Sequence, residues 1–525
     1  MSRLFGLIAA RQYRQAHAEA TERLRVQGRD ADAVVALGLI AFDHANHSKA
    51  FELLGRACAL APDDPHPAAQ FARALSLAGR QREARLWAEA AEARASGRKT
   101  VDAHVLDMTG VVLARVGLHA RAAALFKAAI ARDPAPANTH YNLAASQQFL
   151  GDFRAAETAY RDALRRDPDH YRAMSSLAGL RTQTAGDNRL DALEAAFARL
   201  SDDPDAALHI GHAVAKTLED LGRHAESLAW LARAKAPKRA QVGYDVKTDL
   251  ALFEAAASTY PSRAVDHVQS DAAPIFVTGL PRTGTTLVER ILSSHPDAVS
   301  VGELNAFADA AKRLSGVRGR YVLDPPVMES LLERDVGPLG ADYMAFVGGL
   351  VEALERPEAR PIDKMPLNIL NAGLIHRALP NARIVCLRRG ATDSCLSNYR
   401  QLFSTGHSYY NYGFSLADTA RYYRAFDALA AHWRAQLPSD RFLEIRYEDI
   451  VFDQEAQTRR LLEFCGLSWD ARCLRFHEND APVSTASSVQ VRQPLYSGSI
   501  GRWTRYGAAL DGLRDALGDL AEAAP

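Results

Sequence analysis

The N-terminal half of the chain contains a sequence repeat with a period of 34 residues. ALFKAAIARDPAPANTHYNLA and TAYRDALRRDPDHYRAMSSLA superpose at this offset, which aligns Phe126 with Tyr160 and Gly117 with Gly151. An earlier copy around Pro62 keeps the same internal distances. Apolar residues recur at three- and four-residue spacing, which indicates helices. A repeat of this length predicts helix pairs that bury their apolar faces against neighbouring pairs.

Thirty-four residues is the period of the tetratricopeptide repeat, so a helical solenoid is predicted for residues 1–255. Weaker copies at QYRQAHAEATERL and LGRHAESLAWLARAKAP raise the expected number to about five to seven motifs. An aromatic residue should fill the groove within each pair, and the glycine should lie where two helices approach closely. Two roles are open: a scaffold for the rest of the chain, or a concave surface that binds a polypeptide.

After a linker at 256–272, short β-rich runs alternate with helical stretches. PIFVTG, RPIDK, ARIVCLRR and RFLEIRYEDIV are the expected strands. This alternation predicts an α/β domain at 273–525 with a central, mainly parallel sheet. The predicted fold class is therefore α plus α/β, with a helical solenoid followed by a P-loop-like domain.

Composition narrows the expected partners and location. The 63 basic residues balance the 63 acidic ones, so no nucleic-acid partner is expected. The first apolar run is too short for a secretory signal, and no stretch approaches the ~18 apolar residues that span a bilayer. The five cysteines lack the paired spacing of a zinc site and are expected to be buried thiols. We expect a cytoplasmic protein without stable membrane insertion or a metal, and the oligomeric state stays open.

GLPRTGTT follows the expected strand PIFVTG and opens an expected helix. Such a loop directs backbone N–H groups and the positive end of the helix toward an anion. The candidate anion-binding residues are Arg282, Thr283, Gly284, Thr285 and Thr286. A nucleotide triphosphatase would carry Lys where Thr285 stands, so a P-loop kinase or NTPase is the weakest interpretation.

PRTGTT after an apolar strand resembles the 5′-phosphosulfate loop of sulfotransferases. These enzymes take a sulfuryl group from 3′-phosphoadenosine 5′-phosphosulfate (PAPS), which the resemblance implies as co-substrate. In that superfamily a strand-end Arg and a Ser eight residues later hold the 3′-phosphate. ARIVCLRRGATDSCLSNYRQLF supplies Arg389 and Ser397 at this spacing, with Arg388 as an alternative to Arg389. An arginine fork can bind two phosphate oxygens at once.

The C-terminal half is similar to tyrosylprotein sulfotransferases, and the whole chain resembles bacterial proteins that join tetratricopeptide repeats to such a domain. AVSVGELNAF places Glu303 at that family's general base, and IDKMPLNIL places Lys364 at its catalytic lysine. STASSVQVRQPLYSGSIGRW places Ser487 at the active-site serine and Arg502 at a phosphate-contacting lysine. RYEDIV places Tyr447 at another nucleotide-contacting position.

These residue types suit sulfuryl transfer. An acceptor hydroxyl loses its proton as it attacks sulfur, and the Glu303 carboxylate can take that proton. The leaving phosphate oxygen gains charge, which Lys364, Arg282 and the loop N–H groups would stabilise. Ser487 would orient the group in flight. No metal is required, and the prediction is a PAPS-dependent sulfotransferase.

The acceptor stays open at this stage. Tyrosylprotein sulfotransferases follow their glutamate with an acid and an arginine that helps to read acidic peptides, whereas Leu304 and Asn305 stand here. The acceptor is either a protein tyrosine, with the polypeptide held by the repeats, or a small-molecule, glycan or lipid hydroxyl. The aromatic loop 408–412 either lines the acceptor site or packs as an ordinary loop. A further alternative is a repeat adaptor that binds a nucleotide without turnover.

Overall fold

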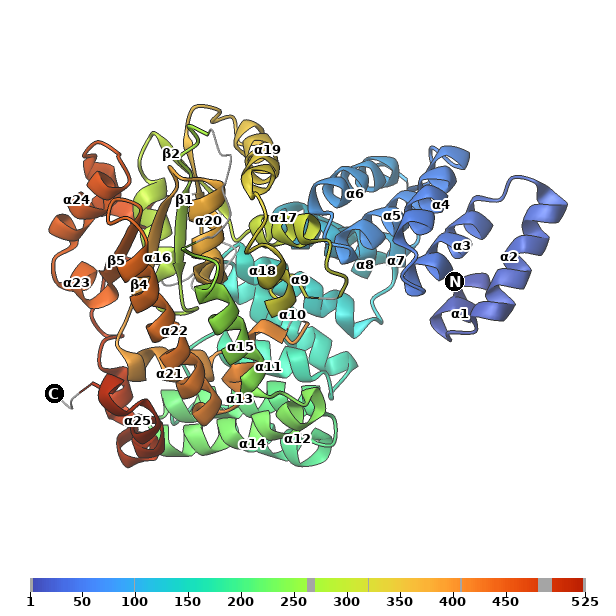
Figure 1. Cartoon of the computed structure of the whole chain (residues 1–525). Coiled ribbons are helices and arrows are strands. Elements are labelled where there is room, and N and C mark those ends of the chain that lie inside the picture. The colour runs from blue at the N-terminus through green and yellow to red at the C-terminus, as the bar shows by residue number, and fades with distance from the viewer. Residues whose placement is uncertain are drawn as a thin grey trace. The chain divides into compact units, whose positions relative to one another are not determined.

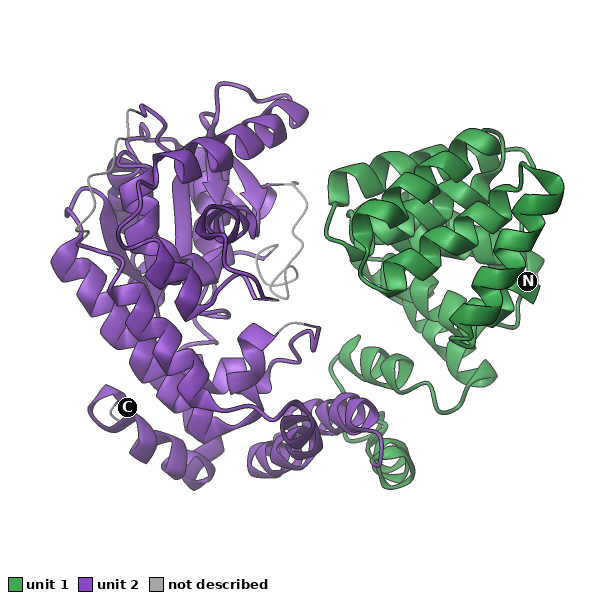
Figure 2. Ribbon diagram, turned by 45° about the vertical axis from the view of Figure 1, so that its right-hand side comes forward, with its two compact units in different colours: residues 1–201 green, residues 202–525 purple. Residues whose placement is uncertain are grey.

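The structure is a computed structural model that describes residues 3–98, 100–261, 270–319, 321–406, 408–479 and 493–522 (Figure 1). The chain forms two compact units, Met1–Ser201 and Asp202–Pro525, which Figure 2 shows in green and purple. The first unit is helical, and the second combines helices with a five-stranded sheet. The predicted fold class is thereby confirmed.

The first unit consists of antiparallel helix pairs. Its helices are α1 (Arg3–Ala9), α2 (Tyr13–Gln27), α3 (Ala31–Asp43), α4 (His47–Leu60), α5 (Pro65–Leu77), α6 (Gln81–Ala95), α7 (Ala103–Arg115), α8 (His119–Arg132), α9 (Ala137–Phe149), α10 (Phe153–Arg166), α11 (Tyr171–Gly179) and α12 (Leu190–Leu200). The apolar spacing of these helices buries one face of each, and alanines fill many of the contacts between pairs.

The repeat residues explain how each pair packs. Phe126 and Tyr160 are each 1% exposed and fill the interior of successive pairs, as predicted. The expected role of the glycines was wrong. Gly117 and Gly151 have φ angles of 82° and 84°, and an added Cβ would meet nothing within 4 Å, so they serve the left-handed turn between the helices. The close approach lies at Gly110, where a Cβ would stand 2.7 Å from the Phe126 ring.

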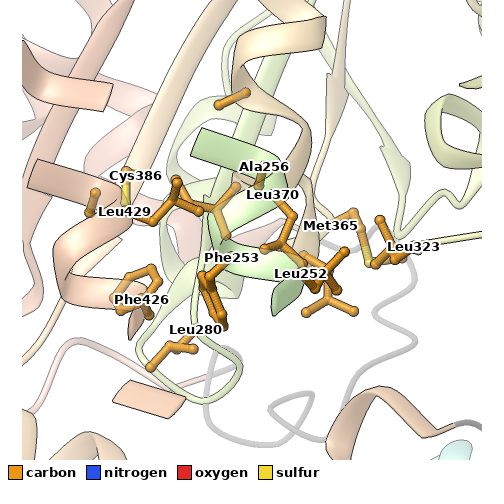
Figure 3. Packing of buried hydrophobic residues seen from close by; sticks show 14 of the residues in the cluster. Leu252, Phe253, Ala256, Leu280, Leu323, Met365, Leu370, Cys386, Phe426 and Leu429 are labelled. Atoms are coloured by element: carbon orange, nitrogen blue, oxygen red, sulfur yellow. The ribbon is translucent and has the colours of Figure 1, made fainter. Parts of the chain in front are cut away.

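Three helices ahead of the sheet belong to the second unit: α13 (Pro204–Asp220), α14 (His224–Val242) and α15 (Val246–Ala257). Figure 3 shows why α15 does so, because Leu252, Phe253 and Ala256 lie in one apolar cluster with side chains from the sheet and its covering helices. The compact units therefore divide at residue 201. The limits 1–255, 256–272 and 273–525 mark a change of sequence pattern and stay a prediction.

The sheet has the order β2-β3-β1-β4-β5, and every neighbouring pair is parallel. Its strands are β1 (Ile275–Gly279), β2 (Ala298–Gly302), β3 (Arg360–Asp363), β4 (Arg383–Arg388) and β5 (Phe442–Arg446). Four strands occur where the sequence predicted them, and β2 was not among the predicted strands. The run RFLEIRYEDIV is a strand only as far as Arg446, because α23 (Tyr447–Phe452) begins at the next residue.

The central strand β1 is buried on both faces, as expected of a parallel sheet covered by helices. Phe276 packs into the cluster on one side, whereas Ile275 and Val277 pack into the cluster on the other. The remaining elements are α16 (Thr285–Ser293), α17 (Ala306–Ser315), α18 (Pro325–Ser330), α19 (Gly337–Ala353), η1 (Pro366–Asn371), α20 (Ala372–Ala378), α21 (Ala391–Arg400), η2 (Ser408–Phe414), α22 (Leu416–Gln436), α24 (Gln454–Phe464), η3 (Ala471–Glu478), η5 (Arg502–Leu510), α25 (Asp511–Leu517) and η6 (Gly518–Leu520).

Two expectations from composition concern the described residues directly. All five cysteines lie within the described ranges, and each is a buried thiol outside any disulfide. Among the helices that the structure describes, none combines the length and the apolar character needed to cross a membrane.

Candidate active site

The five strands of the sheet each lead into one residue predicted for the site. These are Arg282 after β1, Glu303 after β2, Lys364 after β3, Arg389 after β4 and Tyr447 after β5. Parallel strands bring their carboxyl ends to one edge of the sheet. The connection from β1 runs toward β2, whereas that from β4 runs toward β5, so a crevice is expected between β1 and β4.

The loop between β1 and α16 has the backbone of an anion-binding turn. Gly279 has φ 143°, and an added Cβ would stand 2.7 Å from the Leu387 carbonyl oxygen of β4. Gly284 has φ 108°, and its Cβ would stand 2.7 Å from the ring of Tyr447. Arg282 adopts φ 66°, a left-handed conformation that costs a residue with a side chain about 1–2 kcal/mol. The loop is therefore held in an unfavourable shape by its neighbours.

A pocket with about 1070 Å³ of empty volume, part of it open to solvent, lies at this loop. Seven of the predicted residues line it: Arg282, Gly284, Thr286, Arg389, Ser397, Tyr447 and Arg502. Thr283 does not, because its hydroxyl donates to the Leu280 carbonyl oxygen at 2.7 Å and thereby supports the loop itself. Thr285 is buried in the first turn of α16 without lining the pocket.

The two arginines at the end of β4 point to different places. Arg388 donates to the Glu444 carboxylate at 2.8 Å and does not line the pocket. Arg389 lines the pocket, donates to the Arg282 carbonyl oxygen at 3.3 Å, and lies with its guanidinium 5.0 Å from the centre of the Tyr447 ring. Of the two arginines, Arg389 therefore faces the pocket and Arg388 does not.

The charge around the pocket is strongly positive. Among the described residues, four arginines line it, Arg282, Arg389, Arg400 and Arg502, and one carboxylate does, that of Asp393. Burial lowers the pKa of Arg282 to about 10, and the charges of the other three arginines add to the shift. Arg282 stays protonated at neutral pH, but its charge is poorly solvated. An anionic ligand would relieve this repulsion.

Two of these arginines have buried donors that nothing in the described chain satisfies. The Nε atoms of Arg389 and Arg502 are buried and have no hydrogen-bond partner among the described residues. A site that binds a ligand is one reason for such donors, although Arg514 Nε, which does not line the pocket, is also buried without a hydrogen-bond partner among the described residues. Donors of this kind fit phosphate or sulfate oxygens. No cluster of three or more metal-ligating side chains occurs among the residues described.

A second group of charges lies on the other side of β1. Lys364, 1% exposed, forms an ion pair with Glu303 and lies 3.8 Å from the Glu289 carboxylate of α16. Burial raises the pKa of Glu289, and the Lys364 charge opposes that rise. The Glu303 side chain is 38% exposed, so one carboxylate of this group reaches solvent. Neither Glu303 nor Lys364 lines the arginine pocket.

The aromatic loop forms η2 and lies near this carboxylate. Burial raises the pKa of Tyr410 to about 12, with a further contribution from the negative charge of Glu303. The Tyr410 ring stacks on Phe403, with 4.6 Å between ring centres. Tyr412 is buried instead and donates to Asn398 at 2.8 Å, and Asn398 donates to the Pro281 carbonyl oxygen of the phosphate loop. The loop therefore combines packed residues with Tyr410, whose pKa responds to the charge of Glu303.

Some predicted and some unpredicted residues need separate mention. Ser487 lies outside the described residues. Sequence reasoning missed Arg400 and Glu289, although each stands three residues after a predicted residue on the same helix, where side chains share a face. It also missed Glu219 on α13, which forms ion pairs with Arg400 and Arg502. No local signal marked Glu219, since its partners lie far away in the sequence.

Comparison with known proteins agrees with this geometry. Residues 274–471 match the model of the sulfotransferase family. The matched segment begins at β1 and contains Arg282, Glu303, Lys364 and Arg389, whereas Arg502 lies beyond it. In the first unit, residues 137–170 match the tetratricopeptide repeat, which confirms the predicted repeat type.

Two curated relatives each match about half of this chain. An uncharacterised protein of Aquifex aeolicus is 30% identical over 302 residues, which are 56% of this chain and 39% of that protein. The protein-tyrosine sulfotransferase of Drosophila melanogaster is 24% identical over 265 residues, which are 48% of this chain and 50% of that enzyme. The chain thus spans half or less of either relative. The solved sulfotransferase domain of the Synechococcus PCC 7002 olefin synthase covers 46% of this chain and is itself covered to 90%, at 17% identity and a TM-score of 0.34.

Proposed function

We propose that this protein is a PAPS-dependent sulfotransferase that moves a sulfuryl group to an acceptor hydroxyl. The observation that carries the proposal is the arrangement at the carboxyl edge of the sheet. An arginine-lined pocket lies at β1, β4 and β5, and a lysine–glutamate ion pair lies at the ends of β2 and β3, on the other side of β1. A donor held in the pocket would thus have acid–base groups beside it.

The pocket residues divide the task of holding a bisphosphorylated nucleotide. Arg282, Thr286 and the N–H groups at the start of α16 would hold the 5′-phosphosulfate. Arg389 and Ser397 would hold the 3′-phosphate, and Arg502 would add a third cation. The buried, unpartnered Nε atoms of Arg389 and Arg502 support this assignment. The bound donor supplies the activated sulfuryl group.

The ion pair supplies the acid–base chemistry. Glu303 would accept the proton of the acceptor hydroxyl as that oxygen forms its bond to sulfur. Lys364 holds Glu303 in place and, with Arg282, would stabilise the charge that develops on the departing phosphate oxygen. Ser487, which lies outside the described residues, is proposed to orient the transferred group. The proposed reaction uses no metal.

A polypeptide tyrosine is the first acceptor to test. Relatives named protein-tyrosine sulfotransferases support this choice, and so does a stacked aromatic ring, Tyr410, whose pKa responds to the charge of Glu303. The repeat unit would then hold the polypeptide. We place the reaction in the cytoplasm, and small-molecule, glycan or lipid hydroxyls are the alternative acceptors.

The decisive experiment combines mass spectrometry with calorimetry. Cell extract is incubated with the enzyme and isotopically labelled PAPS, and labelled products are compared between wild type and Glu303→Gln. Loss of the base should lower transfer about 10²- to 10⁴-fold. Affinity for 3′-phosphoadenosine 5′-phosphate (PAP), measured by calorimetry, should change by less than about threefold, since Glu303 does not line the pocket.

Glu455→Gln is the matched control, because Glu455 forms only an exposed pair with Arg459 on α24. Unchanged transfer by Glu303→Gln would remove Glu303 from the role of base. Wild type that binds PAP but labels no acceptor would favour the non-catalytic adaptor. Wild type that neither binds PAP nor transfers sulfate would overturn the proposal.

A further inference from the structure

The helix pair α13–α14, residues 204–242, contacts the nucleotide pocket although it lies outside the matched sulfotransferase domain. Glu219 near the end of α13 is the main contact. Its carboxylate accepts from Arg400 Nε at 2.9 Å and forms an ion pair with Arg502. Both arginines line the pocket. One carboxylate from the helix pair therefore connects two pocket cations from α21 and η5.

The Glu219 carboxylate is built into the second unit. Its side chain is 9% exposed. Burial by itself would raise the pKa of Glu219, but the two guanidinium groups outweigh burial and hold this pKa below its usual range. Glu219 is therefore charged throughout the neutral range, and breaking the contact would leave a buried, uncompensated charge.

The same helix pair also holds the segment that follows Arg400. Lys235 of α14 is 2% exposed and donates to the Gly413 carbonyl oxygen at 2.8 Å, with the Gln401 carbonyl oxygen at 3.5 Å. The Gly413 carbonyl directly follows the aromatic loop, and the Gln401 carbonyl lies next to Arg400. Four residues further along α14, Arg239 forms an ion pair with Asp418 at 2.8 Å. Three ionisable side chains of this helix pair thus hold Arg400, the Gly413 carbonyl oxygen and Asp418.

We propose that the α13–α14 pair is a positioning element of the nucleotide pocket, in which Glu219 fixes Arg400 and Arg502 so that they can receive the anionic groups of the ligand. The proposal rests on the proposed function, because the ligand is the PAPS nucleotide. Glu219 is a positioning residue, since it acts through the two arginines and does not itself line the pocket.

The physical reason is the cost of gathering four arginines around one pocket. Like charges repel, and long arginine side chains lose conformational freedom when a ligand fixes them. A shared carboxylate offsets the repulsion and fixes two side chains before binding. It occupies Nε and Nη2 of Arg400 and Nη2 of Arg502, and Arg502 Nε has no partner among the described residues. The arginines therefore keep donors for phosphate oxygens.

The test is PAP affinity by calorimetry in the full-length Glu219→Gln protein. This change keeps the shape of the side chain and removes its charge. The affinity should fall about 5- to 100-fold, because the ligand must then order both arginines itself. Glu226→Gln is the matched control on α14, because Glu226 forms only an exposed pair with Arg223, and its affinity should equal that of wild type.

A double-mutant cycle separates positioning from a general structural effect. In a protein that already carries Arg400→Gln and Arg502→Gln, the further change Glu219→Gln should alter PAP affinity less than twofold. Equal losses in both backgrounds would show that Glu219 does not act through the arginines and would overturn the proposal. An unchanged or tighter affinity of the single variant would overturn it as well.

A measurement on wild type covers the case in which the variants do not fold. Hydrogen exchange is measured with and without PAP. PAP should slow exchange in peptides that cover the end of α13 and residues 400–414, and it should not change exchange in α9 and α10. No slowing at the end of α13 would contradict the proposal while PAP still binds. Absence of PAP binding to wild type would instead contradict the proposed function.

Discussion

Two helix pairs with the same turn have different roles in this chain. The α9–α10 pair of the first unit and the α13–α14 pair of the second both turn at Leu-Gly, with φ 84° at Gly151 and φ 77° at Gly222. The α9–α10 pair packs its apolar face into the core of the repeat unit. The α13–α14 pair directs ionisable side chains to two arginines of the pocket and to the aromatic loop. A shared backbone motif therefore does not imply a shared role.

The difference begins three residues before the turn glycine. In the repeat pair, Gln148 accepts a hydrogen bond from Tyr160 of the same pair at 2.9 Å. In the second pair, Glu219 stands at the place of Gln148 and Leu231 at the place of Tyr160. The amide is thus replaced by a carboxylate, and leucine offers it no hydroxyl group. Glu219 finds its partners in other elements instead.

A second difference lies thirteen residues after the turn glycine. Leu164 packs against the apolar core of the first unit. Lys235 stands at the equivalent place and donates to backbone carbonyls of the aromatic loop. Lys235 therefore distinguishes the pair that contacts the aromatic loop from the pair that packs into the core of the repeat unit.

The largest losses of stability should come from Tyr160 and Leu231, the buried residues that stand nine positions after the turn glycine of each pair. Tyr160→Ala should destabilise the first unit by about 3–5 kcal/mol through the cavity it leaves. Leu231→Ala should destabilise the second unit by about 2–5 kcal/mol for the same reason. Hydrogen exchange would assign each loss to its unit. Only Leu231→Ala should weaken PAP binding in calorimetry. Weaker binding by folded Tyr160→Ala would break the contrast between the two pairs.

The next effect concerns pH and Lys235. Burial lowers the pKa of Lys235 to about 7, whereas the unfolded chain keeps the usual value of 10.5. Between these values the unfolded state binds more protons, so the free energy of unfolding rises with pH. The stability of wild type relative to Lys235→Met should therefore grow by about 2 kcal/mol from pH 7 to pH 9.

Urea unfolding followed by tryptophan fluorescence would measure this change, because four of the five tryptophans lie in the second unit. Leu164→Met is the control at the equivalent position of the repeat pair, and its stability difference from wild type should not depend on pH. If the stability difference between wild type and Lys235→Met did not change with pH, Lys235 would not be desolvated in the folded protein.

The smallest effect should come from Gln148. Gln148→Ala removes one hydrogen bond to Tyr160 and should cost about 1 kcal/mol in the stability of the first unit. PAP affinity should stay unchanged, in contrast to the loss expected for Glu219→Gln at the equivalent place. Urea unfolding and calorimetry on the same preparation would compare the two sites. Reduced PAP affinity in Gln148→Ala would contradict the difference in role between Gln148 and Glu219.

Much of the candidate site follows from local sequence. The loop between β1 and α16 could be found because glycines, threonines and an arginine follow an apolar strand, and Gly279 and Gly284 form the expected turn there. The Glu303–Lys364 pair came from resemblance to a family, since nothing local in either segment shows that they meet. The strand β2 was missed because AVSVG is short and lacks a long apolar run. Most of its residues are only half-buried in the structure, so a strand at this place does not need such a run.

The sequence by itself determined the elements: a 34-residue helical repeat, a parallel α/β domain, and a loop whose turn and charge suit an anion. Tertiary structure decided which side chains meet. It directed Arg389 rather than Arg388 into the pocket, and it brought Glu219 to Arg400 and Arg502. The physical reason is range, because backbone conformation follows from neighbours in sequence, whereas an ion pair depends on segments that only the folded core brings together.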